Sequence, residues 1–164
     1  MKYVYLIIGC FFILIILYIG AKYIVPSGNY SYAEIYEFNI KETQLIKIVE
    51  DFKQKNPQYI VPIEKLKDGK KDSSDYYYGV YSYYSSENNI IYFFIGSSDK
   101  GKAQIGLVSI NDGLTLGHWR DVNKDFSHSE NKEVKKVFEQ RILNNLGLTY
   151  KDKGNGMKIG FIQL

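Results

Sequence analysis

The sequence predicts an α+β protein: an N-terminal transmembrane helix, then an antiparallel sheet of about five strands with two amphipathic helices on one face, in the order β-α-β-β-β-α-β. Three observations predict it. An uncharged apolar run opens the chain, three neighbouring apolar segments are separated by turn-forming residues, and two stretches carry an apolar stripe at helical spacing. Because each amphipathic helix has one apolar side, both suit one face of a sheet.

The apolar run from Tyr3 to Ala21 is long enough to cross a membrane. It contains nineteen residues without a charge, and a helix of that length spans about 28 Å, close to the hydrocarbon thickness of a bilayer. Tyrosines stand at both ends, where amphipathic rings favour the headgroup level. We therefore expect a single-pass signal anchor in the cell membrane, with the lipid bilayer as a partner through residues 3–21.

The domain that follows is expected outside the cytoplasm, which means the periplasm if the source is Gram-negative. So short a tail before the apolar run usually stays in the cytoplasm. Two alternatives remain open. Cleavage after Ala21 makes the run a signal peptide and the domain a secreted protein. The stretch Ile7-Ile8-Gly9-Cys10 resembles a bacterial lipobox, whose cysteine is lipidated, although the most apolar part of the run follows Cys10.

These patterns divide the chain into residues 1–25 as the anchor, 26–29 as a short linker and 30–164 as a soluble α+β domain. The whole chain carries 21 Lys and Arg against 18 Asp and Glu, and two of the lysines flank the apolar run. The domain is therefore almost neutral, and nucleic acid is not an expected partner. The single cysteine lies in the apolar run, so the domain is built without disulfides.

The first elements of the domain follow from local patterns. Residues 30–38 are expected to form a strand, with one side made of Tyr30, Tyr32, Glu34, Tyr36 and Phe38. Asn39 begins a capping pattern with Glu42, so a helix should follow and end before Pro57. Residues 64–75 are rich in Lys, Asp and Ser, which predicts a solvated loop.

Three strands and a second helix come next. Residues 76–85, 89–96 and 102–110 are separated by turn-forming residues, which predicts an antiparallel meander. The middle segment is apolar on both faces, as is typical of an interior strand. A helix is expected from about Ser129 to Gly147, since glycine suits a left-handed helix end. A polar turn over 149–155 and a last strand over 157–164 complete the prediction.

One segment contains every weak candidate for a catalytic or metal-binding role: His118, Trp119, Arg120, Asp121, Asn123, Asp125 and His128. Its two aspartates and Asn123 have the spacing of a calcium loop, but Phe126 replaces the required glycine and Lys132 the bidentate glutamate. No catalytic, metal-binding or cofactor-binding residue is therefore assigned, and no cofactor is expected. Turn formation ahead of the second helix explains the segment better.

These observations favour a non-enzymatic binding domain, such as an envelope accessory or immunity protein, with a protein partner. Sixteen tyrosines suit a partly exposed sheet face, and binding requires an exposed aromatic patch there. The alternative is a small membrane-bound hydrolase that uses His118 or His128 with Asp121 or Asp125. That function requires these side chains to converge in a pocket, with a histidine hydrogen-bonded to a carboxylate.

Overall fold

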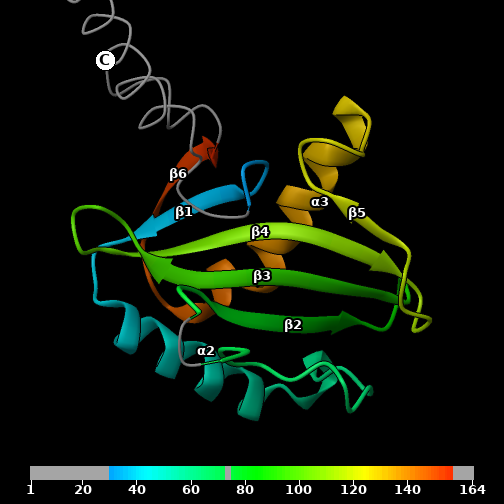
Figure 1. Ribbon diagram of the computed structural model, residues 1–164, viewed down its shortest axis with the longest axis horizontal. Coiled ribbons are helices and arrows are strands. Elements are labelled where there is room, and N and C mark those ends of the chain that lie inside the picture. The colour runs from blue at the N-terminus through cyan, green and yellow to red at the C-terminus, as the bar shows by residue number, and fades with distance from the viewer. Residues whose placement is uncertain (1–29, 73–74, 157–164) are drawn as a thin grey trace, which may run out of the picture.

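The computed structural model describes residues 30–72 and 75–156. They form an α+β fold in which a six-stranded antiparallel sheet carries two helices (Figure 1). The predicted anchor over residues 3–21 and the predicted last strand over 157–164 both lie outside the described residues. Within residues 30–72 and 75–156, no helix is both long and apolar enough to cross a bilayer.

The described residues contain, in order, β1 (Glu34–Phe38), α2 (Glu42–Lys55), the 3-10 turn η1 (Pro57–Tyr59), β2 (Tyr78–Tyr84), β3 (Asn89–Ser97), β4 (Ala103–Asp112), β5 (Trp119–Asp121), α3 (His128–Arg141), the 3-10 turn η2 (Leu143–Leu146) and β6 (Tyr150–Asn155). The strand order across the sheet is β2-β3-β4-β1-β6. The predicted meander is therefore confirmed, and β3 is an interior strand as its two apolar faces indicate.

Strand β4 shares one of its edges between two partners. β1 pairs with the first half of β4, from Ala103 to Leu107, and β5 pairs with the second half, from Ser109 to Asn111. Val108 lies between the two pairings and is itself the extra residue of a β-bulge, because neighbouring residues Tyr92 and Phe93 of β3 pair with Ser109 and Leu107. The edge therefore changes partner at a bulge, which interrupts regular pairing and re-aims nearby side chains.

Both helices cover the same face of the sheet, as predicted. The main core lies between that face and the helices, and it includes Tyr36 of β1, Phe93 of β3, Leu45 of α2 and Phe138 of α3, all at most 1% exposed. In Figure 1, α3 passes behind β3 and β4. Burial of these large side chains away from water is the main force that holds the helices on the sheet.

The helix ends partly follow the predicted signals. α2 starts at Glu42 and ends at Lys55, before Pro57 as expected, but its N-cap is Lys41 and not Asn39. The Lys41 backbone N–H donates a hydrogen bond to Gln44 Oε1 at 3.1 Å. α3 is capped by Ser127, whose backbone N–H donates to Glu130 Oε2 at 2.9 Å. The prediction that this helix continues to Gly147 was wrong, because α3 ends at Arg141 and the 3-10 turn η2 follows it. Gly147 itself has the predicted left-handed conformation, with a φ of 68°.

The sequence placed the start of the first strand wrongly and missed two strands. A turn from Tyr30 to Ala33 precedes β1, closed by the hydrogen bond from Ala33 N to Tyr30 O, so Tyr30 lies on the face opposite to Tyr36. Residues 150–155 form β6, where a polar turn was expected, because β1 offers a free edge whose backbone groups need partners. The three-residue β5 was also not predicted, and the edge of β4 stabilises it in the same way.

Of the polar loop predicted over residues 64–75, residues 64–72 and 75 are described, and within them Asp68 and Gly69 lie against the outer edge of β2. Gly69 pairs with Gly79 through two backbone hydrogen bonds of 2.9 Å. Asp68 Oδ1 accepts a hydrogen bond from the Tyr81 backbone N–H at 2.9 Å, and its other oxygen forms an ion pair with Lys53. Asp68 and Gly69 therefore hydrogen-bond backbone groups of β2 that an edge strand otherwise leaves free to pair with other chains.

No helix of the described residues covers the second face of the sheet, which we call the open face. Aromatic rings lie there directly over glycines of the strands: Phe94 over Gly106, Tyr77 over Gly96 and Tyr92 over Gly79. A Cβ atom at Gly106 would lie 2.2 Å from Cε1 of Phe94, which is closer than atoms can approach. The absence of a side chain at these positions lets the rings approach the backbone closely.

We expect Gly106→Ala to reduce the free energy of unfolding by about 1–3 kcal/mol, because the new methyl group overlaps the Phe94 ring. Urea unfolding, followed by the fluorescence of Trp119, measures this loss. The control is the same substitution in a Phe94→Leu background, where the cost of the methyl group should be smaller. Equal costs in both backgrounds would contradict the proposed ring contact.

Glu87 in the β2–β3 turn pairs with Arg141 at the end of α3, through oxygen-to-nitrogen distances of 2.7 and 2.5 Å. The hydrogen bonds from Arg141 lower the pKa of Glu87 to about 2. Because the folded pKa is depressed, the pair contributes stability above the unfolded pKa of about 4.5, and this stability is lost as the pH falls toward 2.

Glu87→Gln should therefore destabilise the protein at neutral pH by less than about 1 kcal/mol, since the pair is partly exposed. The difference from the unmodified protein should shrink between pH 4.5 and about 2. Urea unfolding at a series of pH values measures it, with Glu133→Gln as the control. A deficit that does not change with pH would refute the assignment.

Candidate functional site

The open face carries a connected group of aromatic side chains, which we call the aromatic face: Tyr30, Tyr76, Tyr77, Tyr81, Tyr92, Phe94 and Trp119. The ring centroids of Tyr77 and Phe94 lie 4.1 Å apart, and those of Tyr81 and Tyr92 lie 4.8 Å apart. Tyr30 reaches across β4 and stacks on Phe94 at 5.4 Å. Trp119 adjoins Tyr92 at 6.4 Å. Each ring contacts another, so the group forms one surface.

This surface combines apolar rings with hydroxyl groups. Phe94 is 2% exposed, whereas Tyr76 is 64% exposed and the other rings are half-buried. The hydroxyls of Tyr30 and Tyr92 lie 2.8 Å apart and share a hydrogen bond. Burial raises the pKa of Tyr77, Tyr81 and Tyr92, so these phenols are neutral at physiological pH. The predicted arrangement, with tyrosines on a partly exposed sheet face, is confirmed.

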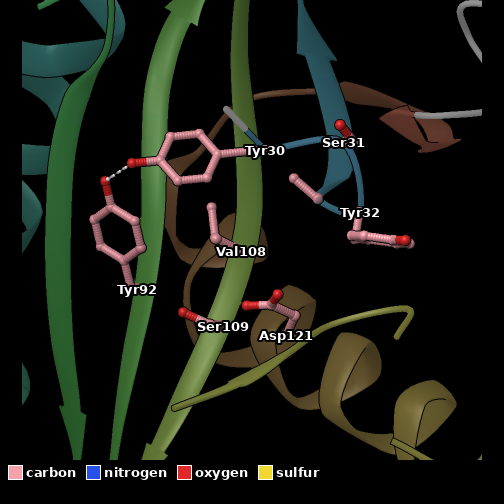
Figure 2. Close-up of a pocket in the computed structure, with 8 residues that line it drawn as sticks. Tyr30, Ser31, Tyr32, Tyr92, Val108, Ser109 and Asp121 are labelled. Atoms are coloured by element: carbon pink, nitrogen blue, oxygen red, sulfur yellow. Dashed lines mark hydrogen bonds between the residues drawn. The ribbon is translucent and has the colours of Figure 1, made fainter. Parts of the chain in front are cut away.

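A pocket of about 240 Å³ opens at one end of the aromatic face, where β4 changes partner from β1 to β5. We call it the strand-junction pocket. Its walls come from residues 30–33 ahead of β1, Tyr92 of β3, Val108 and Ser109 of β4, and Asp121 of β5. Figure 2 shows the tyrosine pair on one side and the polar groups of Ser109 and Asp121 on the other.

Ser109 and Asp121 are direct cross-strand partners, so their side chains lie on the same face of the sheet. Ser109 is 4% exposed, and no group in residues 30–72 or 75–156 hydrogen-bonds its hydroxyl. Asp121 Oδ2 pairs with Lys124 Nζ at 3.3 Å. The pocket therefore presents a buried hydroxyl beside a carboxylate whose charge is balanced locally.

A second polar cluster lies on the helix-covered side of the sheet, between β1 and the first turns of α3. Glu34 is 3% exposed, and its carboxylate accepts a hydrogen bond from Asn123 Nδ2 at 2.8 Å and pairs with Lys135 Nζ at 3.3 Å. Asn131 donates to Asn123 Oδ1 at 2.7 Å. An open hollow of about 370 Å³ adjoins this cluster. Because the charge of Glu34 is paired and hydrogen-bonded, the cluster joins β1 to α3.

The two histidines occupy different parts of the molecule. His118 is exposed in the β4–β5 loop, where its backbone N–H donates to Asn111 Oδ1 at 2.9 Å, and His128 is the exposed first residue of α3. Across the described ranges, no hydrogen bond joins a histidine to a carboxylate, and no group of three or more His, Cys, Asp or Glu side chains could hold a metal ion. The geometry that the hydrolase hypothesis requires is not seen in this part of the chain.

Four of the remaining sequence candidates have four different roles. Trp119 lies on the aromatic face and Arg120 pairs with Asp112 at 3.3 Å, with its guanidinium 4.1 Å from the Phe126 ring. Asp125 accepts a hydrogen bond from the Asp121 backbone N–H at 2.8 Å, which closes the turn before α3. Asn123 has a φ of 63° and holds Glu34. Among the candidates, Trp119 and Asp121 alone reach the open face and its pocket.

Sequence reasoning did not select Tyr30, Tyr92, Ser109 or Glu34 as site residues. Tyr30 and Tyr92 were part of a general tyrosine excess, and nothing in their local pattern distinguishes them. A hint was present for Glu34, because it is a charged residue in a strand whose other inward positions are aromatic. Ser109 gave no signal, since its significance depends on the partner change at Val108.

Comparisons with known proteins find no relative: no protein-family model matches the chain, and no curated protein or solved structure matches it.

The polar cluster below α3 allows a test of its structural role. Lys135→Met removes the cation that pairs with the buried Glu34, so it should reduce the free energy of unfolding by about 1–3 kcal/mol. The neighbouring Lys136 makes an exposed pair with Glu133, and Lys136→Met should change stability by less than about 0.5 kcal/mol. Urea unfolding compares the two, and equal effects would show that Glu34 does not depend on Lys135.

Proposed function

We propose that this chain is a membrane-tethered binding protein whose domain contacts a protein partner through the aromatic face. The observation that carries the proposal is the aromatic face itself: a connected set of tyrosines with Trp119, on a sheet face that no helix of the described residues covers. Tyrosine and tryptophan are the residues most enriched at the energetic centres of protein interfaces, because they combine a large apolar ring with a polar group.

The packing of these rings supports a role in recognition. Tyr77 and Tyr92 pack closely on Gly96 and Gly79 and against neighbouring rings, so they lose little conformational freedom when a partner binds. Burial raises the pKa of both phenols, so their hydroxyls remain neutral. A rigid surface that offers both apolar area and hydrogen bonds suits a specific partner.

The proposed membrane anchor complements this surface. Residues 3–21 are apolar and uncharged, and the proposal places them in the bilayer with the domain outside the cytoplasm. Tyr30, the first described residue, lies on the aromatic face. An extended chain spans at most about 3.6 Å per residue, so residues 25 to 30 cover no more than about 18 Å. The partner is therefore expected at the membrane surface.

Photo-crosslinking in the cells that naturally produce the full-length protein tests this proposal. We expect a photoreactive phenylalanine analogue at Tyr81 to give a discrete crosslinked product in the membrane fraction, and mass spectrometry identifies the protein attached. Tyr77→Ser, introduced in the same chain, should reduce the yield at least about tenfold, since loss of a central aromatic contact costs more than about 1.4 kcal/mol.

The matched control places the same analogue at Lys47, an exposed position on α2. It should give no such product. The same product from both positions, or none from Tyr81, would overturn the assignment of the aromatic face. Recovery of the protein only in the soluble or secreted fraction, without its first residues, would overturn the tether and support cleavage after Ala21.

A further inference from the structure

The strand-junction pocket is a separate feature from the aromatic face, although Tyr30 and Tyr92 belong to both. We propose that this pocket binds one ring of a neutral carbohydrate. The inference goes beyond the protein partner proposed above and does not depend on it, because the groups that carry it, Ser109 and Asp121, lie on β4 and β5.

The charge of the pocket favours a neutral ligand. Among the described residues that line it, Asp121 is the only one with an ionisable carboxylate or amine. Lys124 already balances that carboxylate at 3.3 Å and also lies 5.5 Å from the Tyr32 ring centre. An anion would be repelled by Asp121, and a cation would have to compete with Lys124 for both groups. A neutral ligand meets neither obstacle.

The hydrogen-bonding groups favour a ligand with several hydroxyls. The buried Ser109 hydroxyl can both donate and accept, and it has no partner among the described residues. The Asp121 carboxylate next to it accepts hydrogen bonds, through two oxygens of which Lys124 contacts one. Adjacent donors and acceptors of this kind match neighbouring hydroxyls on a sugar ring.

The shape of the pocket favours a single ring. Its volume of about 240 Å³ is below the roughly 300–1,000 Å³ of sites for drug-sized ligands. The apolar part of its wall consists of Val108, Ala33 and the tyrosine rings. A sugar ring carries C–H groups on its faces and hydroxyls at its edge, so it can place the C–H face against aromatic rings while its edge reaches Ser109 and Asp121 (Figure 2).

Fluorescence titration of the full-length protein tests the inference. Trp119 is the only tryptophan of the chain and lies on β5, two residues from Asp121, so its emission should respond to ligand. The protein is held in polyoxyethylene detergent, which has no sugar headgroup. The probes are short soluble oligosaccharides of glucose, galactose, mannose and N-acetylglucosamine, and at least one should give a saturable change.

The substitutions Ser109→Ala and Asp121→Asn should each weaken that binding at least about tenfold, which corresponds to loss of one buried hydrogen bond to the ligand. Two matched controls should leave it unchanged. Ser86→Ala removes an exposed serine hydroxyl in the β2–β3 turn, and Glu133→Gln breaks an exposed ion pair with Lys136 that has the same three-residue spacing as Asp121 and Lys124.

The inference is overturned if none of these sugars gives a saturable response. It is also overturned if neither Ser109→Ala nor Asp121→Asn weakens sugar binding. Saturable, Asp121-dependent binding of tetramethylammonium without binding of sugars would also overturn it, in favour of a cation site. Urea unfolding of each variant shows whether the fold is retained. If one of the two pocket variants does not fold, the other still tests the inference. Because Tyr81 crosslinking and sugar binding use different residues, failure of one is distinguishable from failure of the other.

Discussion

The packing of aromatic rings on glycine backbone is the contact on which the open face of this sheet depends. A sheet has two faces to bury, and both helices of the described residues lie on one of them. On the open face, Phe94, Tyr77 and Tyr92 pack over Gly106, Gly96 and Gly79. This removes apolar area from water without a second layer of helices, and it leaves ring faces and hydroxyls accessible to a partner.

The partner change along β4 creates the second distinctive feature. Continuous pairing with one long strand would place a regular ladder beside Ser109 and leave no space. Instead β1 ends its pairing at Leu107, β5 begins at Ser109, and the bulge at Val108 separates them. A buried hydroxyl and a carboxylate thereby face the tyrosine pair across a small pocket. Bulges at such positions commonly re-aim side chains near functional sites.

Much of the fold could be predicted, because local patterns report local structure. The stripe of Leu45, Val49 and Phe52 identified α2, and the two apolar faces of β3 identified an interior strand. The errors fell where tertiary contacts overrule local preference. Residues 150–155 are polar and contain a glycine, yet they form β6 because the edge of β1 needs hydrogen-bond partners. The turn at Tyr30 was missed because the alternation of tyrosines continues through it.

The candidate site was less accessible to such reasoning. Asp121 and Trp119 were selected because they stand in a segment with scarce chemical groups, but Ser109 and Tyr92 come from strands that look ordinary in isolation.

What the amino-acid order determined by itself is the class of fold, the amphipathic helices, the meander and an apolar, uncharged leading run, since these depend on the spacing of neighbouring residues. Only the tertiary structure decided which tyrosines share a face, which glycines lie beneath them, and that Ser109 meets Asp121. Those facts depend on strand register and on the change of partner along β4, which bring together residues far apart in the chain.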